Sequence, residues 1–259
     1  MEEEIWIKNR EIGGKRPLVC VPVIGKTREK ISKEVTELAK ENIDIIEWRM
    51  DWYEKSNSIE NCLTLLEEIS NICQDVILLC TFRSKSQGGE KELNPETYCK
   101  LLKAVAESEY ADIIDVEVCN LQNAKEVIEL LHQTTRCIIG SDHNFLKTPS
   151  VQIMAEKLMY MKRIGADIGK LAVMPQNKLE VLHLLEASIM LKEYYPDYPI
   201  ITMSMGRMGM ITRIAGTFSG SCVTFGAAQH ASAPGQLPVA QLTTILDKIM
   251  ESMEEWDEK

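Results

Sequence analysis

Residues 166–174 read Ala166-Asp167-Ile168-Gly169-Lys170-Leu171-Ala172-Val173-Met174, a short apolar run with one cation, Lys170, in its interior. Turn residues flank the run and helical patterns lie on both sides of it, which is typical of a buried parallel strand. Lys170 has two interpretations. In the first it sits at the strand's end, with its aliphatic stem packed and its ammonium in water. In the second it is desolvated, which lowers the pKa of the amine and makes it a nucleophile toward carbonyl carbons.

Similar apolar runs alternate with helical patterns along the rest of the chain. Ser58 is a favoured N-cap for one of these helices, and Pro95 suits the first turn of the helix that follows the Gly88-Gly89 loop. Besides the Lys170 strand, strands are predicted at 18–25, 43–51, 76–83, 112–119, 136–145, 199–205 and 221–225. Helices are predicted at 27–42, 58–73, from 95, and at 124–134, 150–164, 178–195 and 238–256, with a glycine-interrupted helix near 208–216.

Eight β/α units in 259 residues predict an α/β fold of the (β/α)8 TIM-barrel type, with residues 1–259 forming a single catalytic domain. A doubly wound sheet is the main alternative. It is disfavoured because no glycine-rich phosphate-binding turn follows the first strand. Residues 5–16 precede that strand, and we expect them to form a short hairpin or plug over the bottom of the barrel.

The composition is that of an ordinary globular protein, with 45% hydrophobic and 26% charged residues and a net charge of −10. The negative charge argues against broad electrostatic binding to nucleic acid or to an anionic membrane. Residues 1–6 are acidic and lack a long apolar core, so we expect no signal peptide. No later apolar run is long enough to span a bilayer, so we expect no membrane span and a cytoplasmic location. The eight cysteines form no C-x-x-C pair and have no histidine at ligand spacing, which predicts reduced thiols and no metal site.

Polar side chains gather at one end of the predicted strands. In a barrel, inward-facing and outward-facing residues alternate along each strand, and catalytic groups come from the C-terminal strand ends. In five successive strands an apolar residue is followed, at the same parity, by polar ones. Because helices cover the outward positions, we expect these polar residues to surround one cavity. They are Glu47, Arg49 and Asp51; Thr81 and Arg83; Asp115 and Glu117; Ser141 and His143; and Lys170.

This convergence favours the reactive interpretation of Lys170. Burial among apolar neighbours and like charge from Arg49 or Arg83 would both lower the pKa of its amine, which suits Schiff-base formation with a ketone. His143 is the best candidate to move a proton, because it alone among the histidines lies at a strand end and imidazole titrates near neutrality. The other histidines fall in predicted helices or in the final loop: His132, His183 and His230.

Arginines, methionines and a loop complete the predicted site. Three arginines offer planar donor forks for carboxylate and hydroxyl oxygens: Arg49, Arg83 and Arg213. For Arg49 a structural ion pair with a neighbouring carboxylate is the alternative. Met203 and Met205 are expected to be apolar walls. The segment Gln229-His230-Ala231-Ser232-Ala233-Pro234-Gly235-Gln236 is rich in small residues and is either a lid over the site or an ordinary loop.

Together these motifs resemble type I 3-dehydroquinate dehydratase across almost the whole chain. Each motif is weak alone, but their order and their places on successive strands make the combination specific. The motifs are Glu47-Trp48-Arg49, Thr81-Phe82-Arg83 with Gly88-Gly89-Glu90, Ser141-Asp142-His143-Asn144-Phe145, the Lys170 strand, Met203-Ser204-Met205-Gly206, Arg213 and Ser232-Ala233-Pro234-Gly235-Gln236.

The resemblance implies a (β/α)8 barrel that dehydrates 3-dehydroquinate to 3-dehydroshikimate in the shikimate pathway, and it suggests a homodimer; no cofactor is expected. It implies that Lys170 forms an imine with the substrate ketone. His143 would take the adjacent proton, deliver one to the departing hydroxyl, and assist imine formation and hydrolysis. The implied substrate contacts are Glu47, Arg49 and Arg83 for the ring hydroxyls, and Arg213, Ser232 and Gln236 for the carboxylate and the lid.

Two positions depart from the family pattern. Where a glutamate is expected just before the Gly88-Gly89 pair, this chain has Gln87. A glutamine can hydrogen-bond to imidazole but brings no charge to stabilise an imidazolium. Thr212 stands where a serine is expected, which keeps the hydroxyl.

Two other functions stay open on the sequence. A class I aldolase or transaldolase also uses a strand lysine, but it cleaves a carbon–carbon bond of a sugar phosphate, and no convincing phosphate-binding glycine loop follows strands seven and eight. A non-catalytic barrel that binds an anionic metabolite would form no covalent adduct. That alternative leaves the convergence of Lys170 and His143 unexplained.

Overall fold

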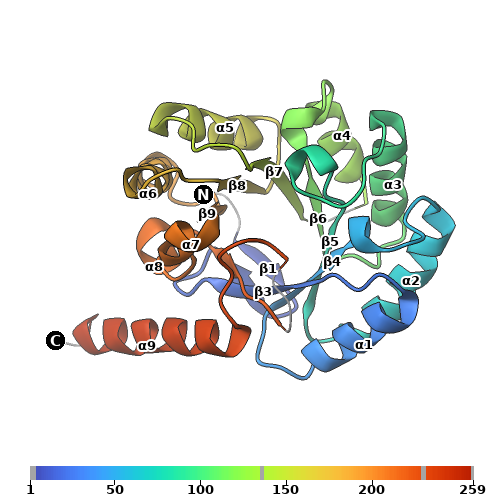
Figure 1. The fold of residues 1–259 in the computed structure, drawn as a ribbon, viewed down its shortest axis with the longest axis horizontal. Helices are drawn as coiled ribbons and strands as arrows, with labels where there is room; N and C mark the ends of the chain where they lie inside the picture. Colours follow the sequence, from blue (N-terminus) through green and yellow to red (C-terminus); the bar gives the residue numbers. More distant parts are fainter. Residues whose placement is uncertain (1–3, 135–136, 229–231, 258–259) are drawn as a thin grey trace.

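The computed structural model describes residues 4–134, 137–228 and 232–257, and its centre is a ring of parallel strands (Figure 1). Eight strands form one sheet in the order β10-β3-β4-β5-β6-β7-β8-β9. A parallel bridge joins Ile200 of β9 to Ser221, just before β10, so the sheet closes almost completely and the predicted barrel is confirmed. The strands are β3 (Leu18–Val23), β4 (Ile45–Arg49), β5 (Ile77–Thr81), β6 (Ile113–Val116), β7 (Ile138–Asn144), β8 (Ile168–Val173), β9 (Ile200–Ser204) and β10 (Val223–Phe225).

Helices alternate with these strands and surround the barrel (Figure 1). Ser58 caps α2 by accepting a hydrogen bond from the Asn61 amide, and Pro95 opens α3, as the sequence predicted. The helices are α1 (Arg28–Leu38), α2 (Ile59–Ile72), α3 (Pro95–Glu107), α4 (Ala124–Leu131), α5 (Val151–Arg163), α6 (Lys178–Tyr194), α7 (Gly206–Gly209), α8 (Gly216–Ser219) and α9 (Val239–Asp257). Within the described residues, no helix combines the length and apolar character needed to cross a membrane.

The predicted glycine-interrupted helix near 208–216 is present only as short helical segments. The chain there forms α7, the short 3-10 helix η4 (Met210–Arg213) and α8. The Thr212 hydroxyl donates to the Gly209 carbonyl and accepts from the Ser204 amide, so side-chain bonds tie this segment to the end of β9. Such local bonds compete with a continuous helix.

Most predicted strands extend too far. β6, predicted to run to residue 119, ends at Val116 because the chain turns into the 3-10 helix η3 (Val118–Asn120). Arg136, the predicted start of the fifth strand, lies outside the described residues, and β7 begins at Ile138.

The predicted alternation of inward and outward residues is confirmed by two separate apolar clusters. Ile45, Ile139 and Ile168 belong to the cluster inside the barrel. Ile46 and Trp48, of the opposite parity, belong to the larger cluster between barrel and helices. Polar residues that share the parity of Ile45 therefore point into the barrel.

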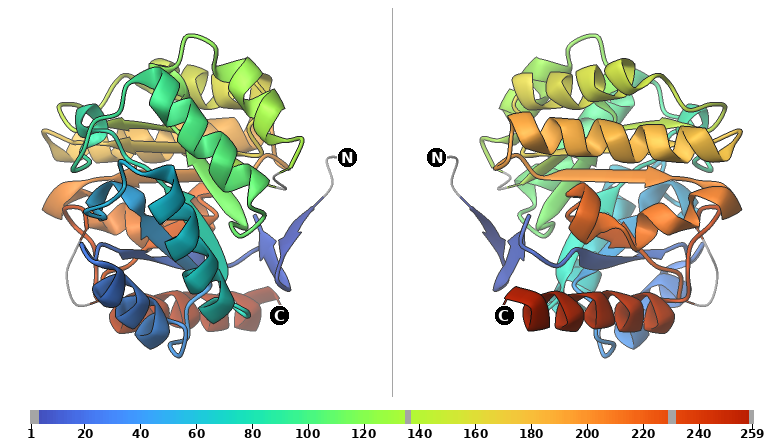
Figure 2. Two further views of the ribbon diagram at one scale, coloured as in Figure 1. Left: turned by 90° about the vertical axis from the view of Figure 1, so that its right-hand side faces the viewer. Right: turned by 90° about the vertical axis from the view of Figure 1, so that its left-hand side faces the viewer.

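Residues 5–12 form the predicted hairpin, which lies at one end of the barrel (Figure 2). Its antiparallel strands are β1 (Ile5–Ile7) and β2 (Arg10–Ile12). Lys8 Nζ lies 2.6 Å from Asp112, which precedes β6, and Arg10 Nε lies 3.1 Å from Asp44, which precedes β4. The hairpin thus covers the N-terminal ends of the strands and leaves the C-terminal ends for the site.

Candidate active site

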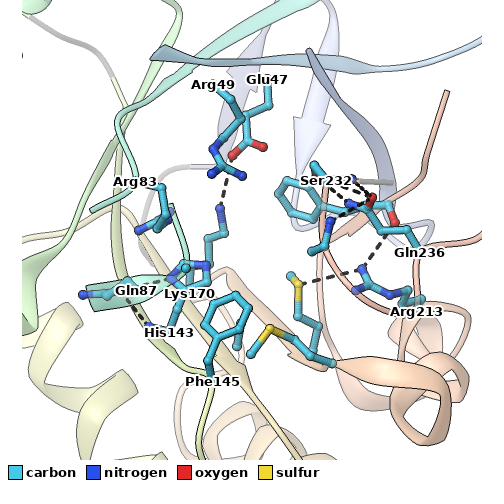
Figure 3. Close-up of a pocket in the computed structure, with 16 residues that line it drawn as sticks. Glu47, Arg49, Arg83, Gln87, His143, Phe145, Lys170, Arg213, Ser232 and Gln236 are labelled. Carbon is cyan, nitrogen blue, oxygen red and sulfur yellow. Dashed lines mark hydrogen bonds and ion pairs between the residues drawn. The ribbon is translucent and has the colours of Figure 1, made fainter. Parts of the chain in front are cut away.

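A pocket opens at the C-terminal ends of the barrel strands and is partly open to solvent (Figure 3). The structure brings all the predicted site residues to this pocket: Glu47, Arg49, Arg83, His143, Lys170, Arg213, Ser232 and Gln236. Met203 and Met205 line it as predicted. Among the residues that the structure describes, no cluster of His, Cys, Asp and Glu is arranged to hold a metal ion.

Lys170 is buried in the middle of β8, with 3% of its surface exposed, so the interpretation that its ammonium reaches water is wrong. Its Nζ lies 2.9 Å from Asp115 Oδ2 and 3.6 Å from Glu47 Oε1. The Phe225 ring covers it, with the ring centroid 4.6 Å from Nζ. The amine is therefore shielded from solvent and neutralised by two carboxylates.

Asp115 contacts most of the charged groups in this cluster, a role that the sequence pattern does not reveal. Its carboxylate binds Arg83 Nη2 at 2.8 Å and accepts a hydrogen bond from Ser141 Oγ at 2.6 Å. Burial raises the pKa of Asp115, but Arg83 and Lys170 outweigh burial and hold that pKa well below its usual range. Asp115 is consequently a permanent anion rather than a proton donor.

Arg83 and Arg49 are both held by carboxylates. Arg83 Nη1 lies 3.0 Å from Glu117 Oε1, in addition to the pairing of Arg83 with Asp115. Arg49 donates from Nε and Nη2 to the two carboxylate oxygens of Asp51, each at 2.8 Å. The structural ion pair considered for Arg49 is thus present, and Arg49 lines the pocket at the same time.

His143 lies beside Lys170 in the pocket and contacts the side chain of Gln87 (Figure 3). Gln87 Oε1 accepts the backbone N–H of His143 at 2.8 Å and lies 3.2 Å from His143 Nδ1. Burial, reinforced by the positive charges of Arg83 and Lys170, lowers the pKa of His143 well below its ordinary value. The imidazole is therefore neutral at neutral pH and able to accept a proton.

Arg213 faces the pocket from the opposite side to His143 (Figure 3). It is 2% exposed, and its guanidinium donates to the carbonyls of Phe225 at 3.3 Å and Pro234 at 3.1 Å. No carboxylate of the described residues pairs with it. Burial lowers the pKa of Arg213 to about 10, which leaves it cationic at neutral pH. A buried cation without a counterion is suited to an anionic ligand.

Hydrogen bonds connect the two ends of residues 232–236, the described part of the predicted lid, which lines the pocket. Gln236 Oε1 accepts the Ser232 amide at 2.8 Å, and Gln236 Nε2 donates to Ser232 Oγ at 3.0 Å. The Gly206 amide donates to the Pro234 carbonyl, which joins the loop to α7. His230 and its neighbours at 229 and 231 lie outside the described residues.

The pocket combines three groups with different chemical capacities. A buried amine can attack a carbonyl carbon, a neutral imidazole can move a proton, and a buried guanidinium can bind a carboxylate. These three groups come from Lys170, His143 and Arg213, around one cavity. The arrangement suits a keto acid that loses or gains a proton next to its carbonyl.

Known proteins share both the sequence and the fold. Residues 19–253 match the family described as Type I 3-dehydroquinase. The 3-dehydroquinate dehydratase of Clostridioides difficile (strain 630) is 41% identical over 254 residues, which cover 98% of this chain and 100% of the relative. A crystal structure of type I 3-dehydroquinate dehydratase from Clostridium difficile with covalent modified comenic acid has a TM-score of 0.93 and 42% identity, covering 97% of this chain and 100% of that chain. The 3-dehydroquinate dehydratase of Geobacillus kaustophilus HTA426 has a TM-score of 0.92 and 33% identity, covering 96% and 97% of the two chains.

Proposed function

The chain belongs to the type I 3-dehydroquinase family, and from this premise we propose how its pocket dehydrates 3-dehydroquinate. It is a hydro-lyase of the shikimate pathway, and type I enzymes work through a Schiff base. The observation that carries our assignment is the buried amine of Lys170, 2.9 Å from Asp115, in a pocket that also holds His143 and Arg213. Mixing the chain with 3-dehydroquinate should produce the conjugated enone chromophore and no smaller fragments, whereas an aldolase would give two fragments.

Lys170 is the nucleophile in this proposal. Its Nζ, once deprotonated, attacks the ketone carbon, and loss of one water leaves an iminium that links enzyme and substrate. Asp115 and Glu47 flank the nitrogen, so they stabilise its positive charge both before the attack and in the iminium. The iminium withdraws electrons and makes the adjacent C–H acidic.

His143 is the proton carrier. As a neutral base it removes the acidic proton, and the electron pair of the broken C–H bond forms an enamine. The enamine then expels the β-hydroxyl, which takes the proton from His143 and leaves as water. A second water hydrolyses the conjugated iminium, which releases 3-dehydroshikimate and regenerates the Lys170 amine. The net change is loss of one water.

The other pocket residues bind and orient the substrate. Arg213 binds the carboxylate, because it is the buried cation that no described carboxylate neutralises. Ser232 and Gln236 close over that end of the ring. The ring hydroxyls are oriented by residues on the opposite wall: Glu47, Arg49 and Arg83.

Replacing Arg213 with alanine is expected to raise KM and to lower kcat/KM roughly 10²- to 10³-fold, the usual cost of removing one partner of a buried charge pair. Arg213→Lys keeps the charge but loses the planar fork, so we expect it to recover only part of the loss. Steady-state kinetics of both variants check this. Arg207→Ala, on α7, is the matched control and should leave KM unchanged. Wild-type KM in Arg213→Ala would remove this residue from carboxylate binding.

We also propose that residues 1–259 act as one catalytic domain, that the enzyme is a homodimer and that it works in the cytoplasm. Family membership supports these proposals. Exposed apolar side chains on η4 and α8, Ile211 and Phe218, offer surface for a second copy. Light scattering of the purified chain measures its mass directly. A mass of 29.4 kDa rather than twice that value would contradict the dimer.

A further inference from the structure

We propose that two buried carboxylates, those of Asp51 and Glu117, determine which end of the pocket accepts the carboxylate of the substrate. They neutralise the two arginines beside Lys170, so that Arg213 at the opposite end receives the carboxylate. The pocket then rejects ligands that carry a second carboxylate at the Lys170 end. The proposal rests on the carboxylate binding proposed above for Arg213. It goes further because it states what keeps the other arginines from binding a carboxylate.

The pocket is lined by three arginines, and a guanidinium is well suited to bind a carboxylate. They are Arg49, Arg83 and Arg213. Figure 3 shows Arg213 across the pocket from Arg83 and Lys170. A ring with one carboxylate could therefore bind in two opposite directions. Only the direction that places the carboxylate on Arg213 leaves the far side of the ring, with its ketone, for Lys170.

Asp51 occupies part of the guanidinium of Arg49 and cancels its charge. Asp51 is completely buried in the 3-10 helix η1 (Met50–Trp52), directly after β4. Its two oxygens accept hydrogen bonds from Nε and Nη2 of Arg49, each at 2.8 Å. They also accept the backbone amides of Arg83 at 3.3 Å and Glu90 at 3.0 Å, which hold the carboxylate in place. Burial lowers the pKa of Arg49, but Asp51 outweighs burial and the pKa is raised.

Glu117 does the same for Arg83. Glu117 is 2% exposed, and its Oε1 lies 3.0 Å from Nη1 of Arg83. The same oxygen accepts the Ser84 amide at 2.9 Å, which fixes it beside the guanidinium. Asp115 also pairs with Arg83, but it is shared with Lys170, which lies 2.9 Å away from it. Arg83 therefore depends on Glu117 for a carboxylate that no other cation uses.

The two ends of the pocket consequently differ in charge. At the Lys170 end, Arg49, Arg83 and Lys170 each have a carboxylate at 2.8–2.9 Å. Glu47 lies 3.6 Å from Lys170 Nζ, so four carboxylates face three cations there. Arg213 reaches no carboxylate of the described residues, and its buried Nε has no acceptor among them. A ligand carboxylate is thus attracted to Arg213 and repelled at the Lys170 end.

Two ligands without a ketone measure this preference: cyclohexanecarboxylate and trans-cyclohexane-1,4-dicarboxylate. With one carboxylate on Arg213, the dicarboxylate places its other carboxylate across the ring, at the Lys170 end. NMR titration gives both dissociation constants without turnover. In the wild type we expect the dicarboxylate to bind at least roughly 10-fold more weakly than the monocarboxylate, because it brings like charges together. Equal or tighter binding of the dicarboxylate would overturn the proposal.

Asp51→Asn keeps the shape of the side chain and removes its charge, which leaves Arg49 without a carboxylate of its own. The ratio of the two dissociation constants should move toward the dicarboxylate by roughly 10- to 100-fold. Damage to the pocket alone would weaken both ligands alike, so a wild-type ratio would refute the role of Asp51. Asp247→Asn is the matched control and should not change the ratio, because Asp247 pairs with Arg16, 2.9 Å away, at the N-terminal end of the barrel.

The double variant Arg49→Met/Asp51→Asn removes the cation together with its carboxylate. Replacing both partners of a buried ion pair by uncharged groups is often tolerated. If the effect of Asp51→Asn arises from the freed guanidinium, the ratio should return to the wild-type value in the double variant. A ratio like that of Asp51→Asn alone would contradict this explanation.

Glu117→Gln makes the corresponding change at Arg83 and decides the question if Asp51→Asn does not fold. We expect a shift in the same direction but smaller, because Asp115 still pairs with Arg83. A wild-type ratio would remove Glu117 from the proposal.

Arg213→Ala tests the premise separately. It should weaken binding of the monocarboxylate, and unchanged binding would show that the carboxylate lies elsewhere. These titrations need no catalysis, so they decide the proposal independently of the enone chromophore that tests the enzymatic function.

Discussion

Lys170→Ala should lose dehydration almost entirely, with kcat/KM falling on the order of a million-fold, the lower end of enzymatic rate accelerations. Without the amine no iminium forms, and the C–H next to an unactivated ketone is too weak an acid for His143 to ionise. Asp115 and Glu47 would also lose their cation, although Asp115 keeps its pairing with Arg83. Arg83 therefore limits the structural damage from an uncompensated buried carboxylate.

Borohydride trapping measures the covalent step directly. Reduction converts the imine to a stable secondary amine, so digestion and mass spectrometry of the wild type should show the adduct on the peptide that contains Lys170. Lys170→Met, which keeps an unbranched side chain of similar length, should be folded and carry no adduct. Lys100→Ala removes an exposed lysine and should keep both adduct and activity. Mass added at another lysine would refute the assignment.

The barrel, and the places of Lys170 and His143 in it, could be predicted because successive side chains of a strand point alternately to its two faces. Lys170, His143 and Arg83 follow apolar residues of the same parity, and in a parallel barrel this places them at one end of one cavity. The apolar clusters confirm that parity: the odd-numbered positions of β4 face the barrel interior, and Ile46 and Trp48 face the helices.

The ion-pair network could not be predicted from the same pattern. Asp115 and Glu117 share a parity, but which of them contacts Lys170 depends on the register between strands, where Ser141 on β7 pairs with Lys170 on β8. Only the arginines were expected as charged neighbours of the amine. Asp115 lies between Arg83 and Lys170 instead, within 2.9 Å of both. The amine of Lys170 therefore has both a negative and a positive charge close to it, rather than positive charges alone.

Loop contacts were the second limit on prediction. Gln87 stood out only as a departure from the family pattern, and its contact with His143 depends on how the 3-10 helix η2 (Lys85–Gln87) folds back over β7. Arg213 was identified as a site residue, while the helix predicted around it is divided into the short segments α7, η4 and α8. Its placement depends on the side-chain bonds of Thr212 to Gly209 and Ser204, which periodicity does not reveal.

His143→Ala should lower kcat by about 10²- to 10⁴-fold, the usual contribution of a positioned general base, while the imine on Lys170 still forms. The physical reason is that iminium formation acidifies the C–H without removing its proton, and unpositioned water is a much weaker base than imidazole. The trapped fraction after borohydride treatment should therefore be as high as in the wild type or higher, because the intermediate accumulates. Single-turnover kinetics with trapping at successive times measures both rates.

The comparison of formation and decay separates two roles that His143 could fill. If the histidine acted only in proton abstraction, the imine would form in His143→Ala at the wild-type rate, and this imine would then decay slowly. If it also assists imine formation and hydrolysis, as the family resemblance implies, both rates fall and product release slows with them. His183→Ala, at an exposed position on α6, is the matched control and should change neither rate. Unchanged turnover in His143→Ala would remove the imidazole from the mechanism and, with it, the reason for Gln87 to hold it.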